Sequence, residues 1–184
     1  MTHDNSIDNV EVKKDYFSSD ALWRESPLVN GKKHGIVKTY HESGAIYSET
    51  PYVNGVKHGI AKQYHDSGAL WIETPYVNGV IHGIEKEYYK SGALFGETPY
   101  VNEQRHGIAK SHYESGILRW EAPYVKGNMH GIEKTYYGSG ALWEETPYVN
   151  GKRHGIEKYY YKNKLNIGCL TLYKGDNDVL ILCL

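Results

Sequence analysis

Six histidines recur along the chain with a spacing of 24 residues: His34, His58, His82, His106, His130 and His154. Imidazole nitrogens bind zinc and act as general bases near neutral pH, so such a series could serve either chemistry. Zinc requires all its ligands within about 2.0 to 2.3 Å, whereas residues two strands apart in a sheet are separated by roughly 10 Å. The spacing therefore predicts structural histidines and no metal or other cofactor, with partner binding as the alternative role.

A Ser-Gly pair recurs in the same way, at residues 43–44, 67–68, 91–92, 115–116 and 139–140. A serine can act as a nucleophile when a base activates it, but each of these serines lies in a predicted turn, where its hydroxyl can bond to the local backbone. An active site is also one constellation of groups with unequal pKa values, whereas here every His, Ser and Glu has several equivalents. The repetition predicts that the protein is not an enzyme and has no catalytic residues. A hydrolase that uses one of the histidines is the alternative.

The composition narrows the class of protein further. The chain has 184 residues, 40% of them hydrophobic, which suits one domain with a buried interior. Its 21 Lys and Arg balance 22 Asp and Glu, and no basic stretch offers a path for phosphates, so a nucleic-acid partner is not expected. Two cysteines, no apolar leader and no apolar run long enough to span a bilayer predict a soluble protein of the cytoplasm.

The histidines and serines belong to one repeated unit. Its starts lie 24 residues apart, at Pro27, Pro51, Pro75, Pro99, Pro123 and Pro147. The consensus is P-Y-V-N-G-x-x-H-G-I-x-K-x-Y-x-x-S-G-A-L-x-x-E-T. Residues 12–26 match the second half of a unit, residues 27–170 form six units of 24 residues, and residues 171–184 are predicted capping strands. The whole chain, 1–184, is thus predicted to be a single repeat domain.

Each unit contains two runs that favour extended structure. Residues 58–64 are rich in β-branched and aromatic side chains and lead to Asp-Ser-Gly, where Gly68 suits a three-residue hairpin loop. Residues 69–77 form the second run, which ends at Asn-Gly, another strong turn signal. We therefore predict an all-β fold, an elongated single-layer antiparallel β-meander of 24-residue hairpins.

The turns set the expected register of the hairpins. If both loops hold three residues, His58 lies opposite Tyr52 and Tyr76, and Tyr64 lies opposite Leu70. In that register the recurring lysines and glutamates fall on opposite faces and form two solvated charge ladders. These residues are Lys38, Lys62, Lys86, Lys110, Lys134 and Lys158, with Glu49, Glu73, Glu97, Glu121 and Glu145.

The same residues carry a family resemblance. The stretch "YVNGVKHGIAKQYHDSGAL" resembles the MORN repeat, and more closely its bacterial variant, in which N-G-x-x-x-G-x-x-x-x-Y-x-x-x-G-x-L recurs with about this period. The resemblance covers residues 12–168 and extends to the YwqK-like antitoxin (immunity) family, whose members are built largely of that variant. It implies a single-layer β-meander that neutralises a toxin by direct binding. MORN repeats have also been linked to phospholipids, so a membrane-lipid-associated scaffold is the alternative, although the near-neutral charge and evenly spread lysines speak against it.

Recognition is expected where the units differ, because the constant positions specify the sheet. The variable positions carry large aromatic side chains, which often anchor protein interfaces, although a single-layer sheet also needs such residues to cover its backbone. The fourth unit departs most from the consensus, with His112 for tyrosine and Arg119-Trp120 in its second strand. A contact site and sequence drift are both open explanations. The predicted partner-binding residues are Tyr47, Trp71, Tyr89, Phe95, Tyr113, Arg119, Trp120, Tyr137 and Trp143.

The C-terminal segment falls outside the repeat pattern. The stretches "CLTLY" and "VLILCL", joined by "KGDND", are predicted to be two final strands. Because the second is apolar at every position, it is expected to be buried, either by capping the last edge of the sheet or by pairing with a second copy of the chain in a homodimer.

Overall fold

The protein is described by a computed structural model, which covers residues 9–161, 167–174 and 177–183. Every element in these residues is a β-strand, and paired strands run antiparallel. The predicted all-β fold is confirmed. The chain divides into two units, Met1–Ile81 and His82–Leu184. No helix in the described segments is long and apolar enough to cross a membrane.

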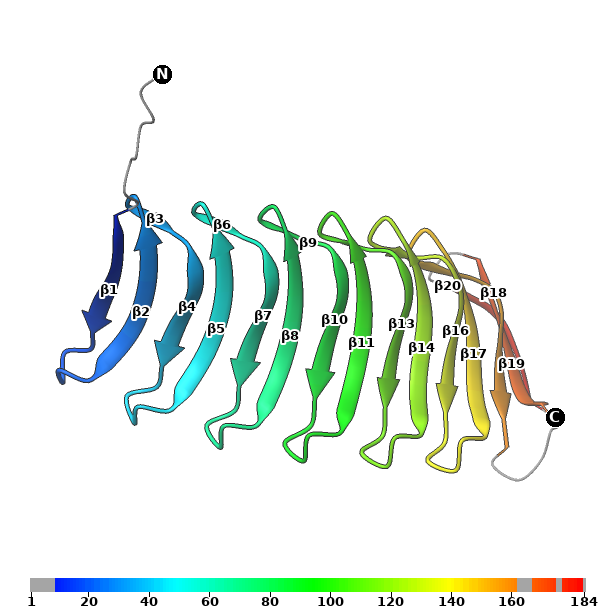
Figure 1. Ribbon diagram of the computed structural model, residues 1–184. Coiled ribbons are helices and arrows are strands. Elements are labelled where there is room, and N and C mark those ends of the chain that lie inside the picture. The colour runs from blue at the N-terminus through cyan, green and yellow to red at the C-terminus, as the bar shows by residue number, and fades with distance from the viewer. Residues whose placement is uncertain (1–8, 162–166, 175–176, 184) are drawn as a thin grey trace, which may run out of the picture. The chain divides into compact units, whose positions relative to one another are not determined.

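The first unit is a single layer of hairpins (Figure 1). Each long strand pairs with the next long strand along the chain, so the connectivity is a meander. The two-residue strands β3, β6 and β9 close the Asn-Gly hairpins. The strands are β1 (Val10–Tyr16), β2 (Leu22–Val29), β3 (Lys32–Lys33), β4 (Gly35–Tyr40), β5 (Ile46–Val53), β6 (Val56–Lys57), β7 (Gly59–Tyr64), β8 (Leu70–Val77) and β9 (Val80–Ile81).

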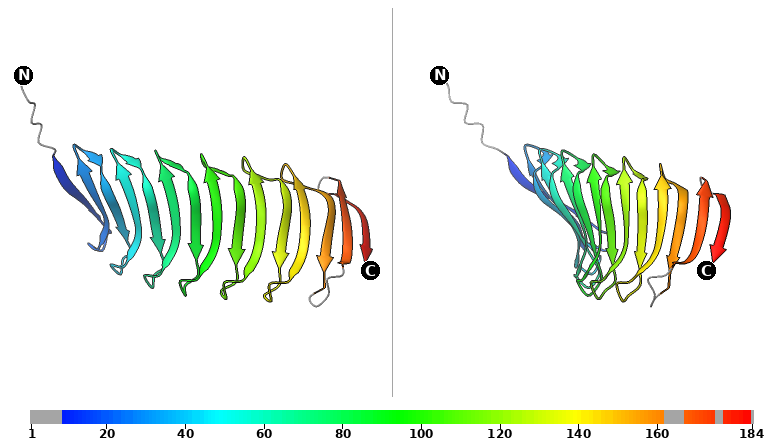
Figure 2. Two further views of the ribbon diagram at one scale, coloured as in Figure 1. Left: turned by 45° about the vertical axis from the view of Figure 1, so that its right-hand side comes forward. Right: turned by 90° about the vertical axis from the view of Figure 1, so that its right-hand side faces the viewer.

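The second unit repeats this connectivity, and its strands also lie in one layer (Figure 2). Its last repeat has a longer first strand, β18, in place of a short strand and a long one. The strands are β10 (Gly83–Tyr88), β11 (Leu94–Val101), β12 (Gln104–Arg105), β13 (Gly107–His112), β14 (Leu118–Val125), β15 (Asn128–Met129), β16 (Gly131–Tyr136), β17 (Leu142–Val149), β18 (Lys152–Tyr160), β19 (Ile167–Lys174) and β20 (Asn177–Cys183).

The two turns of each repeat differ in length. At the Asp-Ser-Gly turn, the backbone nitrogen of His65 donates to Ala69, and Gly68 has a φ of 82°, so the loop holds three residues as predicted. At the Asn-Gly turn, Val53 pairs directly with Val56, and Asn54 and Gly55 both have positive φ. This loop therefore holds two residues, and the prediction of three was wrong. The Asn-Gly sequence favours such a two-residue turn because asparagine and glycine tolerate the left-handed backbone region.

A β-bulge after each Ser-Gly turn corrects the expected register further. Tyr64 lies opposite Leu70 as predicted, but the next pair is Gln63 with Ile72, so Trp71 is the extra residue of the bulge. The bulge shifts the pairing by one position along the rest of the hairpin. As a result His58 lies opposite neither Tyr52 nor Tyr76. The predicted register holds only at the loop end of the hairpin.

This shift places the recurring lysines and glutamates on one face, which we call the ion-pair face. Lys38 lies opposite Glu49 with 3.4 Å between Nζ and Oε1, and Lys62 and Glu73 are 3.8 Å apart. The prediction of separate charge ladders on opposite faces was therefore wrong. Because the lysines are about 40% exposed, each pair contributes at most about 1 kcal/mol.

The opposite face holds most of the small core, and we call it the core face. It carries the second-position tyrosines and the residues that alternate with them. Examples are Ala109 and Ala122 of the fourth repeat and Tyr124 of the fifth, all of which are buried. No second layer formed by the described residues covers the sheet within either unit. The recurring isoleucines of the ion-pair face are exposed, and Ile60 for example is 54% exposed. Stability in such a sheet depends on contacts between adjacent hairpins rather than on a deep interior.

The two predicted final strands are present as β19 and β20, which form a hairpin. Strand β19 pairs with β18, and among the described strands β20 pairs only with β19. Ile181 and Leu182 of β20 are 61% and 50% exposed in the single chain, so burial of this strand by a second copy stays a prediction. Cys169 is disulfide-bonded, and the register places Cys183 opposite it. Disulfides are typical of oxidising compartments and are rare in the cytoplasm, which is the predicted location of this protein.

Candidate functional site

At each Ser-Gly turn, the bulge residue lies against the residue just before the three-residue loop. Ring centroids are 5.6 Å apart for His65 and Trp71 and 5.2 Å apart for Tyr89 and Phe95. The fourth repeat alone has an arginine at the bulge, and the Arg119 guanidinium lies 5.8 Å from the centre of the Tyr113 ring. A bulge redirects its side chain away from the strand's regular alternation. The predicted partner-binding residues Tyr47, Trp71, Phe95, Arg119 and Trp143 all occupy this one structural position.

The tyrosines before the turn have a structural task as well. The phenol of Tyr89 donates to the carbonyl of His112 at 2.7 Å, and the phenol of Tyr113 donates to the carbonyl of Tyr136 at 2.7 Å. Tyr137 continues the series to the carbonyl of Tyr160 at 3.0 Å. Each bond links one hairpin to the next, 23 residues along. These three predicted partner-binding residues therefore also hold the sheet in line.

Trp120 lies on the core face, in a row of residues that face one another across adjacent strands. Its neighbours in the row are Ser111 on β13 and Thr135 on β16, and beyond Ser111 lies Gly96 on β11. On the same face, Trp120 packs against the cluster that contains Ala109 and Ala122, which are 2% and 0% exposed. Small residues on both sides thus leave room for the indole.

This arrangement leaves a hollow of about 330 Å³ in the second unit, and we call it the fourth-repeat hollow. Its lining combines aromatic side chains with one serine, one threonine and one arginine. The lining residues are Phe95, Ser111, Tyr113, Arg119, Trp120, Thr135, Tyr136 and Trp143. Five of the predicted partner-binding residues meet here, namely Phe95, Tyr113, Arg119, Trp120 and Trp143. The lining does not include Tyr89 and Tyr137, and Tyr47 and Trp71 belong to the first unit.

The sequence prediction missed the hollow's smaller lining residues. Ser111 and Thr135 occupy a variable strand position on either side of Trp120, and Tyr136 is a constant residue. Gly96 offered a signal, because it stands where the fourth repeat has Trp120. Only the observed register reveals that these two positions lie in one cross-strand row.

Two carboxylates lie next to residues that line the hollow. The indole nitrogen of Trp120 donates to Glu133 Oε1 at 2.5 Å, and Glu144 lies opposite Thr135 on the neighbouring strand. Burial raises the pKa of Glu144, and the nearby Glu157 and Glu133 raise it further, although a hydrogen bond from Thr146 opposes them. Glu133 and Glu157 therefore disfavour the charged form of Glu144.

One lining hydroxyl has no partner. The Oγ1 atom of Thr135 is buried and makes no hydrogen bond to any of the described residues. A buried hydroxyl without a partner costs free energy, which a hydrogen bond from a bound group would recover.

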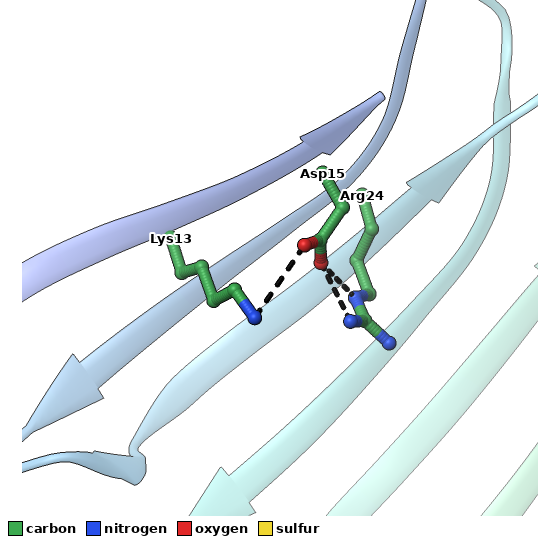
Figure 3. Close-up of polar contacts among 3 residues, drawn as sticks. All are labelled: Lys13, Asp15 and Arg24. Carbon is green, nitrogen blue, oxygen red and sulfur yellow. Dashed lines mark hydrogen bonds and ion pairs between the residues drawn. The ribbon is translucent and has the colours of Figure 1, made fainter. Parts of the chain in front are cut away.

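In the half repeat at the start of the first unit, the position equivalent to Trp120 holds an ion-paired arginine. Arg24 stands where the fourth repeat has Trp120, and its Nε and Nη2 atoms donate to Asp15 Oδ2 at 2.8 and 2.6 Å (Figure 3). Lys13 approaches the other oxygen of Asp15 at 3.5 Å. The hydrogen bond from Arg24 lowers the pKa of Asp15. The charges at this end of the core face satisfy one another.

The recurring histidines and serines have structural roles. All six histidines are exposed, and the backbone nitrogens of His58, His106 and others donate to a proline carbonyl seven residues earlier, at 2.9 to 3.0 Å. The Ser67 hydroxyl accepts from the backbone of Ala69 at 3.5 Å, as the turn prediction implied. Within the described residues, no group of three or more His, Cys, Asp or Glu is arranged to hold a metal ion.

Comparison with known proteins agrees with this architecture. The family model described as MORN repeat variant matches residues 33–54, 57–78, 81–102, 105–126 and 129–150, more than half of the chain. The matches begin at intervals of 24 residues, as the repeat analysis predicted. A search of curated proteins found no match. With the repeat, the hairpins and the matched segments in agreement, the chain belongs to the MORN repeat variant family.

Proposed function

We propose that the chain is a non-enzymatic protein-binding repeat protein that neutralises a bacterial toxin by direct contact in the cytoplasm, with the fourth-repeat hollow as its anchor point. The observation that supports this most is the hollow itself. It gathers Trp120, Trp143, Tyr113 and Arg119 at one place, and tryptophan, tyrosine and arginine are the residues that most often dominate binding free energy in protein interfaces.

A binding role also follows from how the repeats are built. The constant residues form turns, ion pairs and hydrogen bonds between hairpins, which leaves the variable positions free to differ. Three departures of the fourth repeat lie close together: Arg119 and Trp120 line the hollow, and Ala122 belongs to the cluster that packs against Trp120. A stable complex needs about 1,600 Å² of total buried surface, so the partner would also cover neighbouring repeats.

The toxin as partner rests on the resemblance to the YwqK-like antitoxins. The other candidate, a membrane-lipid scaffold, needs a basic surface to hold anionic lipid. Next to residues that line the hollow, the core face instead carries Glu133 and Glu144, which anionic lipid would repel.

A growth assay tests the proposal. The chain is expressed together with the product of the gene immediately upstream of its own, the expected toxin. We expect the chain to restore growth and the Arg119→Ala/Trp120→Ala double variant to fail, while Trp23→Ala, which removes an exposed tryptophan of the first unit, restores growth fully. No toxicity from the upstream product, or full rescue by the double variant, would contradict the proposal. Co-sedimentation with phosphatidylserine vesicles at physiological salt would favour the lipid scaffold instead.

A further inference from the structure

The walls of the fourth-repeat hollow suit a flat cation. Five of its lining residues are aromatic, and aromatic rings attract cations that lie over their faces. These residues are Phe95, Tyr113, Trp120, Tyr136 and Trp143. The hollow is at the small end of the range for ligand pockets, which suits one inserted side chain rather than a whole small molecule.

The chain already pairs guanidinium groups with aromatic rings at several places. Arg105 lies 5.4 Å from the centre of the Tyr124 ring, and Arg153 lies 5.2 Å from that of Tyr173. At the hollow, the Arg119 guanidinium lies over the Tyr113 ring, in the place where other repeats have a second aromatic ring. A guanidinium thus substitutes for an aromatic ring against the wall of this same hollow.

The acceptors beside the walls favour a donor with positive charge. Glu133 and Glu144 carry negative charge next to Trp120 and Thr135, and both are half-buried. The Oγ1 atom of Thr135, which has no partner among the described residues, can accept a hydrogen bond. The positive charge of Arg119 opposes the binding of a cation in the hollow. Because the Arg119 side chain is exposed, water and salt screen its charge more than they screen the half-buried carboxylates.

We propose that the fourth-repeat hollow receives an arginine side chain of the protein partner. The guanidinium would stack on the indole of Trp120 or Trp143 and donate to Glu133 and Glu144. Arginine fits better than lysine, because a planar guanidinium stacks on aromatic rings and presents several donors in a fixed geometry. This inference deepens the proposed function, since it requires a protein partner at the same site.

The test uses short blocked peptides and the side-chain N–H signals of the four tryptophans in a ¹H–¹⁵N NMR spectrum. The probes are Ac-Gly-Arg-Gly-NH₂ and its analogues with Lys, Leu or Glu in the middle. We expect the arginine peptide to shift the Trp120 and Trp143 signals saturably, with the Trp23 and Trp71 signals unchanged. The lysine peptide should bind more weakly, and the leucine and glutamate peptides should have no effect.

Charge-neutral variants test the role of the carboxylates. Glu133→Gln/Glu144→Gln should weaken binding of the arginine peptide by about tenfold, the effect of losing about 1.4 kcal/mol. The matched control is Glu97→Gln, which removes one negative charge from the ion-pair face, where Glu97 lies 3.9 Å from Lys86. It should leave the affinity unchanged. Both glutamine variants keep an acceptor oxygen, so the hydrogen bonds from Trp120 and Thr146 can persist.

The possible failures are distinguishable. Equal or tighter binding of the leucine or lysine peptide would overturn the arginine assignment while leaving the hollow as a binding site. No shift with any peptide, or a shift that the double glutamine variant retains in full, would also overturn it. The growth assay does not depend on these peptides. If the growth assay fails while the hollow still binds the arginine peptide selectively, the toxin proposal is wrong and the arginine site stands.

Discussion

The phenol of Tyr64 donates a hydrogen bond to Glu49 Oε2 of the preceding hairpin at 2.9 Å. The same bond recurs between Tyr40 and Glu25, between Tyr136 and Glu121, and between Tyr160 and Glu145, always 15 residues apart. These bonds cross from one hairpin to the next on the ion-pair face, where Glu49 also meets Lys38. The repeated tyrosine is therefore a link between repeats, which explains why it recurs in a sheet with so small a core.

Removing one such link should weaken the sheet measurably. Tyr64→Phe leaves the ring in place but deletes the hydroxyl, and hydrogen bonds to charged groups contribute more than neutral ones, so we expect a loss of about 1 to 2 kcal/mol in the free energy of unfolding. Urea denaturation checks this value. The fourth repeat provides the converse test, because His112 stands at the tyrosine position and its Nδ1 atom is buried without a partner among the described residues. His112→Tyr should raise stability, and a fall would show that the fourth repeat has no room for the phenol.

The glycine beside the Asn-Gly hairpin should be harder to replace than the glycine of the Asp-Ser-Gly turn. Gly59 has a φ of 111°, and an added Cβ would lie 3.1 Å from Cγ of Pro51. Gly68 has a φ of 82° with open space around it. We expect Gly68→Ala to cost about 1 kcal/mol and Gly59→Ala at least about 2 kcal/mol, measured by thermal and urea unfolding. Equal costs would mean that the proline contact adds nothing.

Alkaline pH should destabilise the protein through the same tyrosines. Burial raises the pKa of Tyr64 from 10.0 to about 12, and the hydrogen bond to Glu49 adds to the shift. A folded-state pKa above the ordinary value means that the associated stability is complete below about pH 10 and is lost as the pH rises toward 12. Urea unfolding at a series of pH values measures the loss. Lysines lose their charge in the same range, so Tyr64→Phe is the control, and its curve should fall less steeply than that of the unmodified chain.

The C-terminal hairpin should respond to reducing agent. Cys169 is disulfide-bonded, and a bond that closes a loop of about 15 residues contributes about 3 kcal/mol in the chain-entropy model. Dithiothreitol should therefore lower the melting temperature of the unmodified chain but not that of Cys169→Ser. The thiol count of the protein isolated from its own cells, measured by mass spectrometry after alkylation, tests the predicted cytoplasmic location, because a persistent disulfide is typical of an oxidising compartment.

Much of the fold was predictable from the sequence because the repeat multiplies each weak signal. A single Ser-Gly or Asn-Gly is only a turn signal, but copies at a constant spacing predict the hairpins and the class of fold. The register was not predictable in the same way. It depends on the bulge at residues such as Trp71 and on the two-residue Asn-Gly loop, and both shift the pairing by single positions without changing the repeat length.

The candidate site was predictable in part for the same reason. The departures at Arg119 and Trp120 marked the fourth repeat, and aromatic residues marked the variable positions. The cross-strand row of Gly96, Ser111 and Trp120 required the register, because it joins positions from two repeats that no linear spacing connects. The bond from Trp120 to Glu133 required it as well.

The central claim is that constant residues hold adjacent hairpins together while variable residues recognise the partner, and one comparison tests it most directly. Affinity for the upstream gene product is measured by isothermal titration calorimetry, and the melting temperature by circular dichroism, for Tyr64→Phe and for Arg119→Ala/Trp120→Ala. The account predicts that Tyr64→Phe lowers the melting temperature and leaves the affinity unchanged, whereas the double variant lowers the affinity at least about tenfold and keeps the β-sheet spectrum. A double variant that binds as tightly as the unmodified chain would contradict it.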